Sequence, residues 1–289
     1  MADERVADER AAETRRTART PVSRRRAAAD RAAPLAGRLL AALVFLFLLA
    51  PLVVLVASSF NTTASVAFPP QGFSTRWYTG VLTSPDWLVS FRLSGLLVLL
   101  VVPTVAVIGT LAAYGLARGN FPGRGAVHAL ALSPLMTPEI ITALGLLYYF
   151  HGIGLVDTVP GLWLAHSLIA LPYAVRAVMV SAAGLDPTLE RAAASLGAGS
   201  TRVFLTVTLP LLRPGILAGA LLAAVTSLGE VAVTALVAGA HTTTVPLRVF
   251  SSAQFELDPS VAAVSTVLLV ASVVVMVVAD RFAKISEVL

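Results

Sequence analysis

Long apolar stretches separated by short polar segments are the main pattern along the chain. Three of these stretches, at 39–57, 93–117 and 259–279, contain no Asp, Glu, Lys or Arg. Each is about as long as the roughly 20 residues that a helix needs to cross a bilayer, whereas barrel strands would alternate in segments of about ten residues. The pattern therefore predicts an all-α membrane protein with six transmembrane helices. We expect these helices at about 37–59, 91–117, 126–150, 160–183, 214–238 and 260–281.

The first part of the chain has a different composition. Residues 1–36 are rich in Ala and Arg and contain the near-repeat ADER, which is typical of a disordered basic tail on the cytoplasmic side. The transmembrane domain then occupies 37–285. A cleaved signal peptide within 1–60 is the alternative, but the apolar run of 19 residues at 39–57 exceeds the usual signal core of about 7–15 residues. An uncleaved first span is therefore favoured.

The net charge of +5 is unevenly distributed along the chain. Residues 1–38 hold ten Arg against six Asp and Glu, so this segment alone accounts for +4. The basic surplus thus lies next to the first predicted span, as the positive-inside rule describes, and not on a surface that would bind nucleic acid. The remaining Arg residues concentrate in alternate loops, which predicts that the N- and C-termini are both cytoplasmic. We therefore expect contacts with membrane lipids and none with nucleic acid.

Residue types needed for common enzymatic sites are sparse. The chain has no Cys, which excludes disulfides, thiolate metal sites and a Cys nucleophile. The only Lys is Lys284, which lacks the Gly-rich run of a phosphate-binding loop. The four His residues, His128, His151, His166 and His241, show no close metal-ligand spacing such as HExxH. The sequence therefore favours a transport component without a catalytic site or a cofactor of its own.

The polar loop at 186–213, between the fourth and fifth predicted spans, contains strong helix signals. Asp186 is a good N-cap and is followed by Pro at the first helical position. An apolar stripe at i, i+3, i+4 and i+7 comes next, and Gly197 can end the helix in the left-handed conformation. Ser200 can cap a second short helix, which we expect to end at Pro210. The loop is thus a stiff two-helix unit, and it lacks the base-reading side chains of a DNA-binding helix-turn-helix.

This loop resembles that of the permease subunits of binding-protein-dependent ABC importers. Those proteins carry the pattern E-A-A, three residues, G, nine residues, I-x-L-P. The positions that match the pattern here are Ala192, Ala193, Gly197, Val207, Leu209 and Pro210. Arg191 stands where the family usually has Glu, with Glu190 one position earlier, and Val207 replaces Ile. The stretches SPLMTPEI and SLGEVAVTALVAG resemble the spermidine/putrescine-type branch of this family.

The resemblance implies a mechanism and a set of partners. The loop at 186–213 would be a coupling helix seated in a groove of a separate ATPase subunit, with ATP and Mg²⁺ bound by that partner. Two ABC ATPase subunits, a second permease subunit and a periplasmic or lipid-anchored solute-binding protein would complete an importer in the bacterial inner membrane. The residues that the resemblance assigns to ATPase coupling are Glu190, Arg191, Ala192, Ala193, Gly197, Val207, Leu209 and Pro210.

Ionisable groups inside predicted spans are costly in lipid and often functional. Glu139 lies in the middle of the third predicted span, Glu230 a little past the middle of the fifth, and Arg176 toward the cytoplasmic half of the fourth. These residues and Ser227, close to Glu230, are candidates for the substrate path. A structural hydrogen bond, or an ion pair between Glu230 and Arg176, is the alternative. Two acids favour a cationic solute such as a polyamine, and a phosphonate or another small polar solute is also considered.

A six-span channel or an ion-coupled secondary transporter without an ATPase is the alternative function. Secondary carriers often contain inverted repeats and broken helices, and the sequence shows no clear internal repeat. The loop at 186–213 favours the importer permease over these alternatives.

Overall fold

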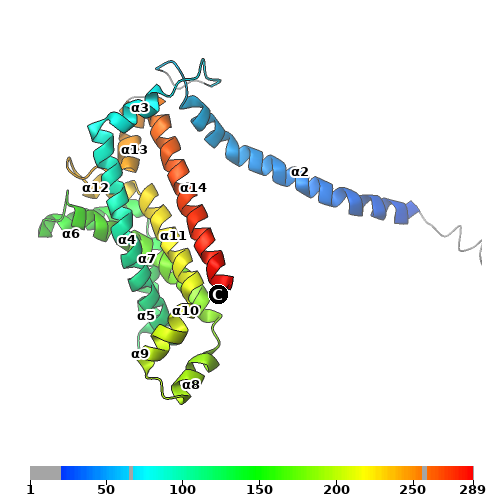
Figure 1. The fold of residues 1–289 in the computed structure, drawn as a ribbon, viewed down its shortest axis with the longest axis vertical. Helices are drawn as coiled ribbons and strands as arrows, with labels where there is room; N and C mark the ends of the chain where they lie inside the picture. The colour runs from blue at the N-terminus through cyan, green and yellow to red at the C-terminus, as the bar shows by residue number, and fades with distance from the viewer. Residues whose placement is uncertain (1–20, 65–67, 256–258, 289) are drawn as a thin grey trace, which may run out of the picture. The chain divides into compact units, whose positions relative to one another are not determined.

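The computed structural model describes residues 21–64, 68–255 and 259–288 (Figure 1). Every regular element in this part of the chain is helical, which confirms the all-α prediction. The chain divides into two compact units, residues 1–55 and 56–289. The first unit holds most of one long helix, and the second holds the bundle that contains the candidate site residues.

Helix α2, Pro21–Ser58, covers the first predicted span. Its apolar part, Gly37–Ser58, is long enough to cross a bilayer. Because the helix begins at Pro21, residues 21–36 of the expected disordered tail are helical. Residues 1–20 lie outside the described residues, and a disordered tail there stays a prediction.

The second unit is a bundle of long helices connected by short ones. In chain order its helices are α3 (Arg76–Thr83), α4 (Pro85–Arg118), α5 (Arg124–Leu132), η1 (Ser133–Leu135), α6 (Glu139–Ile153), α7 (Val159–Ala183), α8 (Pro187–Ser195), α9 (Ser200–Val203), η2 (Phe204–Thr208), α10 (Leu209–Leu211), α11 (Arg213–Gly229), α12 (Ala232–Val237), α13 (Val245–Phe255) and α14 (Pro259–Val288). With α2, four helices in the described part of the chain are each long and apolar enough to cross a membrane, and the spans number up to six if two bent helix pairs each count as one.

The third predicted span is broken, so the expectation of one continuous helix at 126–150 is wrong. The segment folds into two helical parts, α5 with η1 and then α6, which are bent by 102°. Pro134 and Pro138 cause the break, because neither has an N–H group for a helical hydrogen bond and each disfavours helical backbone in the residue before it. Glu139 consequently lies in the first turn of α6 instead of in the middle of a helix.

The fifth predicted span, 214–238, is also interrupted. Helix α11 ends at Gly229, Glu230 has an extended backbone with φ −71° and ψ 119°, and α12 begins at Ala232. Glu230 therefore lies in a break between two helices and not within a continuous span. A separate bend of 68° lies at the other end of α11, where the segment from α9 to α10 joins it.

Small residues let α4 and α11 pack closely against α7 at the centre of the bundle. A Cβ atom added at Gly109 of α4 would lie 2.9 Å from Ala174 Cβ of α7, and one added at Gly219 of α11 would lie 2.9 Å from Ala174 Cα. Lipid provides no hydrophobic force between helices, so close van der Waals contact of this kind is the main source of their association. Helix α7 thus packs closely against both α4 and α11 at Ala174.

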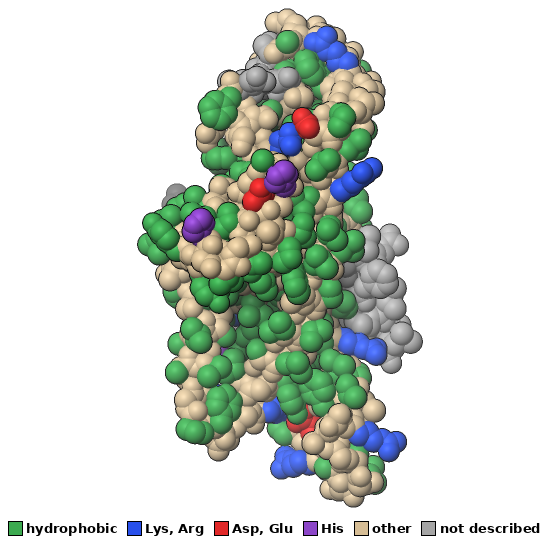
Figure 2. Space-filling view, turned by 90° about the vertical axis from the view of Figure 1, so that its left-hand side faces the viewer, with side chains coloured by type: hydrophobic (Ala, Val, Ile, Leu, Met, Phe, Trp, Pro, Cys, Tyr) green, Lys and Arg blue, Asp and Glu red, His purple; other side chains and the backbone are tan. Residues whose placement is uncertain are grey.

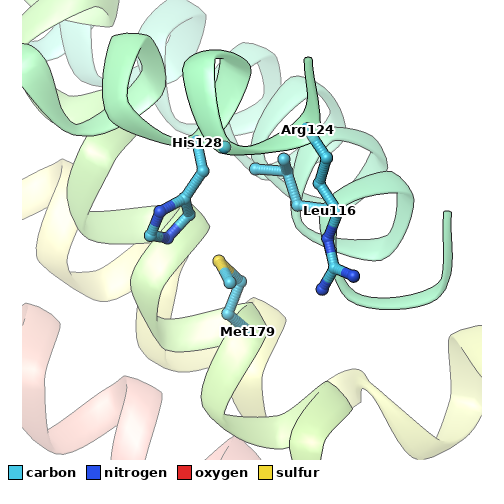
Figure 3. A pocket seen from close by; sticks show the side chains of 5 residues that line it. Leu116, Arg124, His128 and Met179 are labelled. Carbon is cyan, nitrogen blue, oxygen red and sulfur yellow. The ribbon is translucent and has the colours of Figure 1, made fainter. Parts of the chain in front are cut away.

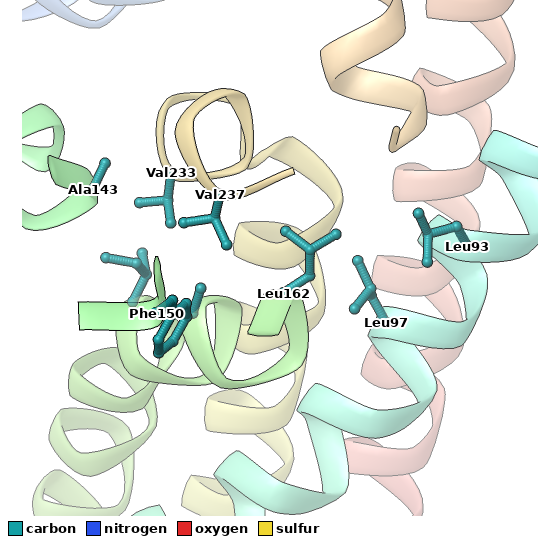
Figure 4. Close-up of a cluster of buried hydrophobic side chains, with 9 residues drawn as sticks. Leu93, Leu97, Ala143, Phe150, Leu162, Val233 and Val237 are labelled. Atoms are coloured by element: carbon teal, nitrogen blue, oxygen red, sulfur yellow. The ribbon is translucent and has the colours of Figure 1, made fainter. Parts of the chain in front are cut away.

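A buried apolar cluster joins the helices that follow the two breaks. Figure 4 shows Phe150 of α6, Leu162 of α7, and Val233 and Val237 of α12 in this cluster. All four side chains are buried. The cluster holds α6 and α12 against one end of α7, and this arrangement places the two breaks near each other.

Gly219→Ala tests the close packing of α11 on α7. The new methyl group would lie 2.9 Å from Ala174 Cα, so the two helices must separate, and overpacking of this kind costs about 1–3 kcal/mol. The thermal unfolding midpoint of the detergent-purified protein should fall by about 5 °C. The control is Gly95→Ala on α4, where an added Cβ meets no atom of the described chain within 4 Å. An equal fall in both variants would contradict the packing argument.

Candidate functional site

Helix α8 opens the loop at 186–213, and both of its ends have the caps expected from the sequence. The Asp186 carboxylate accepts a hydrogen bond from the Thr188 N–H at 2.9 Å, and this bond holds the pKa of Asp186 below its usual value. At the other end Gly197 has φ +89°. The N–H groups of Gly197 and of the next residue bond back to carbonyls in the last turn of α8, which is the Schellman arrangement. The predictions for Asp186 and Gly197 are confirmed.

The second half of the loop differs from the expectation at two points. Ser200 is the first residue of α9 and not its cap, because Gly199 holds the N-cap position without a side-chain hydrogen bond. The helical path also continues past Pro210. Helix η2 is a π-helical turn in which the Leu209 N–H bonds to the Phe204 carbonyl. This wider turn shifts the hydrogen-bond pattern by one residue and so accommodates a proline that has no N–H group.

Glu190 connects α8 to two other parts of the bundle. One of its carboxylate oxygens accepts a 2.7 Å hydrogen bond from the Thr208 hydroxyl of η2. The other lies 3.3 Å from Nε of Arg118, the last residue of α4, and Arg118 also donates to the Leu185 carbonyl at 3.1 Å. Arg191, at the position of the family's usual Glu, is exposed. The acid one position earlier therefore makes the internal contacts, and the sequence analysis missed its partners Arg118 and Thr208.

Part of the outward surface of the loop, on α8, is made of apolar side chains. Leu196 is 90% exposed, and Leu189 and Ala192 are also exposed. The remaining positions that match the family pattern after α8 are partly buried: Val207, Leu209 and Pro210. The loop thus has a free face on α8 and an inner side that packs against the bundle.

The surface of the second unit changes in polarity along its length. On the face drawn in Figure 2, charged side chains lie toward the two ends, and a mainly hydrophobic region separates them. Leu99 and Val107 of α4 are among the large apolar residues that stay exposed. An apolar surface of this kind suits a protein whose middle faces lipid.

The two acids found in the predicted spans lie together, one at each helix break. Only 4% of the surface of Glu230 is exposed, and one of its carboxyl oxygens accepts a 2.7 Å hydrogen bond from the Val233 N–H. Glu230 thereby caps α12. Glu139 is exposed at the start of α6, and its carboxyl group lies close enough to that of Glu230 for the two to interact electrostatically. The breaks bring together two acids that are far apart in the sequence.

Arg176 does not join this pair of acids. It is exposed on α7, and neither of the two ion pairs found among the described residues includes it. The ion pair between Glu230 and Arg176 considered from the sequence is therefore wrong. The alternative of a structural hydrogen bond is confirmed for Glu230 by its contact with the Val233 N–H.

Ser227 is buried and lies beside a histidine. Its Oγ is 3.0 Å from Nδ1 of His166, and Nε2 of the same ring is 2.9 Å from Oγ1 of Thr234. All three residues are buried. The sequence analysis included Ser227 as a candidate but neither His166 nor Thr234. The available signals were weak: a lone His in an apolar span, and a Thr one helical turn after Glu230.

Two cavities lie along α5. The larger, of about 570 Å³, is bounded by α5, η1, α6 and α7, and the hydroxyl-bearing residues Ser133, Thr137 and Thr142 line it. The smaller, of about 260 Å³, lies between α4, α5 and α7, and Figure 3 shows Arg124 and His128 at its edge. The break between α5 and α6 therefore borders open space large enough for a small solute.

Comparison with known protein families decides the class of this membrane protein. Residues 105–287, more than half of the chain, match the family described as binding-protein-dependent transport system inner membrane component. The chain belongs to this family. It is the permease component of an ABC importer, a multi-pass protein of the inner membrane and not an enzyme. The resemblance noted from the loop at 186–213 is thus confirmed.

Two relatives extend the match over most of this permease. The putrescine transport system permease protein PotI of Escherichia coli (strain K12) is 35% identical over 232 residues, which cover 78% of this chain and 82% of PotI. The spermidine/putrescine transport system permease protein PotC of Haemophilus influenzae is 31% identical over 242 residues, which cover 83% of this chain and 93% of PotC. Both agree with the spermidine/putrescine-type branch indicated by the sequence.

A solved structure shows the same fold. The crystal structure of a bacterial alginate ABC transporter in complex with alginate pentasaccharide-bound periplasmic protein contains a chain that matches this permease with a TM-score of 0.69 and 15% identity. The match covers 89% of this chain and 96% of that chain. With the family match, it favours the importer permease over a six-span channel or an ion-coupled carrier.

Arg118→Met and Glu190→Gln should both loosen the loop, because each removes the ion pair, and Arg118→Met also removes the hydrogen bond to the Leu185 carbonyl. The Gln side-chain oxygen can still accept from Thr208. Both charged side chains are partly exposed, so the pair contributes about 1 kcal/mol or less. Tryptic cleavage at Arg202 in the native protein, followed by mass spectrometry, should therefore accelerate about two- to fivefold. Arg248→Met, which breaks the other ion pair, is the control and should leave this cleavage rate unchanged.

The double variant, Arg118→Met with Glu190→Gln, shows whether the two residues act on the cleavage rate through their contact or independently. If Arg118 and Glu190 act through their ion pair, the double variant should be cleaved no faster than Arg118→Met, which already lacks both contacts of Arg118. Additive acceleration would show that the two residues act independently.

Proposed function

We propose that this permease is one of two transmembrane subunits of an importer, and that the loop at 186–213 receives the mechanical stroke of two ATPase subunits. The contacts of Glu190 carry this proposal. They join α8 to α4 through Arg118 and to η2 through Thr208, and η2 leads through α10 to α11. A flexible loop would absorb a movement of the ATPase. This loop is held by an ion pair and a hydrogen bond, so it can transmit the movement to α4 and α11. ATP and Mg²⁺ belong to the partner ATPases.

The outward face of α8 is the surface proposed to enter a groove of the ATPase. Leu189, Ala192 and Leu196 offer exposed apolar area without a charged group. Arg191 lies exposed beside them and can pair with an acidic side chain of the ATPase. Ala193, Val207, Leu209 and Pro210 support this face from the inner side, as the family pattern implies.

The orientation and the remaining partners follow from this placement. The loop and both chain termini are proposed to lie in the cytoplasm, and a periplasmic or lipid-anchored binding protein delivers the solute at the opposite end. The second permease subunit is proposed to cover α6. Five large side chains of that helix are more than half exposed: Ile140, Ile141, Tyr148, Tyr149 and Ile153.

The proposed solute is a polyamine or a related small cation. Glu139 and Glu230 bring two carboxyl groups close to each other at the helix breaks, and Thr137, two residues before Glu139, lines the cavity of about 570 Å³. Such groups attract an ammonium group and repel an anion, because the electrostatic interaction is strong where water is scarce. PotI and PotC, the relatives named above, are putrescine and spermidine/putrescine permeases. A phosphonate would face the same two acids and is disfavoured.

The other path candidates have different surroundings. Arg176 is exposed on α7, and Ser227 is engaged by His166 at 3.0 Å. We therefore assign direct contact with the solute to Glu230 and Glu139.

Gly197→Val tests the coupling role of the loop. The φ of +89° at Gly197 is unfavourable for a β-branched residue by about 1–3 kcal/mol, so the turn after α8 must change shape. In proteoliposomes that contain the whole importer, solute uptake should fall about tenfold while ATP hydrolysis continues. Gly199→Val is the control, because Gly199 has φ −67° and an added Cβ there meets no described atom within 4 Å. Normal uptake in Gly197→Val would count against coupling through this loop.

Glu230→Gln tests the path for a cationic solute. The Gln side-chain oxygen can still accept from the Val233 N–H, so the cap of α12 stays while the acid is lost. The KM for putrescine uptake should rise about tenfold or more, and the amount of assembled importer should stay near that of the wild type. Asp86→Asn, which removes an exposed acid of α4, is the control and should leave the KM unchanged. Loss of assembly with an unchanged KM in the remaining complexes would assign Glu230 a structural role only.

A further inference from the structure

At the break between α11 and α12, nearby side chains form hydrogen bonds with backbone groups. The first N–H groups of α12 and the last carbonyls of α11 cannot bond within one continuous helix, and lipid offers no substitute. The Glu230 carboxyl group accepts from the Val233 N–H at 2.7 Å, and the Thr234 hydroxyl donates to the Glu230 carbonyl at 3.2 Å. The geometry of Glu230 therefore depends on where α12 and Thr234 are held.

His166 holds both sides of this break from a third helix. Its Nδ1 lies 3.0 Å from Ser227 Oγ in the last turn of α11, and its Nε2 lies 2.9 Å from Thr234 Oγ1 in α12. Only 1% of the surface of His166 is exposed, so water does not compete for these contacts. One side chain of α7 thus fixes the distance between the end of one helix and the start of the next.

The directions of these hydrogen bonds follow from the number of protons available. The Thr234 hydroxyl has one hydrogen and donates it to the Glu230 carbonyl, so it accepts from His166, and Nε2 carries the N–H. A neutral imidazole then accepts at Nδ1, where the Ser227 hydroxyl donates. A charged ring would lack a compensating partner in this apolar environment. Ser227, His166, Thr234 and Glu230 therefore form one directed chain of hydrogen bonds.

Helix α7, which carries His166, is held in place by its packing. Leu162 and Ala165, on the preceding turn of α7, are fully buried. Helix α7 also packs closely against α4 and α11 through Ala174. Val233, next to Thr234, belongs to the same buried cluster as Leu162 (Figure 4). Apolar contacts hold α12 close to α7, but they do not fix its rotation, since they have no direction. The hydrogen bonds of His166 supply that direction.

We propose that His166 is a positioning residue for solute passage: it braces the α11–α12 break through Ser227 and Thr234 and thereby aims the Glu230 carboxyl group at the solute path. The orientation of Glu230 toward a solute rests on the proposed function of Glu230. The support of the break by the hydrogen bonds of His166 does not. His166 itself makes no contact with the solute. When the brace is lost, α12 can rotate against α7, Glu230 takes several orientations, and a bound cation gains less from it.

His166→Leu and His166→Gln test this role in the whole importer, reconstituted in proteoliposomes. Leu removes both hydrogen bonds, and the Ser227 hydroxyl can turn to a carbonyl of its own helix, so assembly should persist. The KM for putrescine should rise about tenfold, the effect of one or two buried hydrogen bonds, with Vmax within about twofold of the wild type. Gln can donate and accept and should bring the KM back to within about threefold. Ser167→Ala is the control, because the Ser167 hydroxyl has no hydrogen-bond partner in the described part of the chain.

A cysteine at Val231 tests the brace without a solute. The chain contains no Cys, so one introduced thiol in this subunit can be followed by mass spectrometry. Val231 lies in the break and is partly buried. In Val231→Cys importer, the rate of labelling by a small maleimide should rise about tenfold when His166→Leu or Thr234→Val is added, because the break opens more often. Ser167→Ala should not change this rate.

The two measurements give separate answers. Unchanged labelling in both His166→Leu and Thr234→Val would overturn the brace. Faster labelling with an unchanged putrescine KM would overturn the aiming of Glu230. If wild-type importer does not take up putrescine, the polyamine proposal fails, and labelling still decides the brace. If His166→Leu does not assemble, Ser227→Ala and Thr234→Val, which each remove one arm, decide the brace by the same labelling rates.

Discussion

The structure depends on one constraint: in the hydrocarbon core of a bilayer, backbone N–H and C=O groups must find their partners within the protein. A continuous helix meets this need by itself, but two predicted spans of this permease are broken. At the break after α11, the side chains of Glu230 and Thr234 bond to the exposed backbone groups. At the break before α6, the Thr137 hydroxyl bonds to the Ser133 carbonyl at 3.3 Å. Polar residues at these positions are first of all what makes the breaks possible.

This constraint also explains why the structural role of Glu230 does not compete with the transport role proposed for it. One carboxyl oxygen caps α12, and the second remains for Glu139 or for a cation. An acid that only capped a helix could be replaced by a Ser or Thr, which are good caps and carry no charge. An acid that only contacted a solute would need another group to close the break. Glu230 can do both because a carboxyl group has two oxygens, of which one caps α12.

The features predictable from the sequence are those that depend on neighbouring residues. Asp186 and Gly197 act as caps as expected, because a cap is decided within one helical turn. The expected helix at 126–150 missed the 102° bend, because the angle between its two parts depends on how α6 packs on α7 and α12. The contacts Glu190–Arg118 and Glu139–Glu230 join residues far apart in the chain, and no local pattern pairs them. Ser200 and Pro210 failed as boundaries because the glycine before Ser200 occupies the cap position and a π-helical turn absorbs the proline.

Helix α11 connects the two regions to which functions are proposed. It begins at the 68° bend that follows the loop at 186–213 and ends at the break that contains Glu230. Its 17 residues span about 25 Å at 1.5 Å per residue. Close contacts such as Gly215 with Ala177 and Gly219 with Ala174 seat this helix on α7, and His166 holds its far end at Ser227. A push on the loop therefore cannot simply slide α11 along α7 without breaking the bond at Ser227. A tilt of α11 about Ser227 is compatible with this contact. Such a tilt would move the loop at 186–213 most. It would change the position of Glu230 least, as long as the hydrogen bonds of His166 are kept.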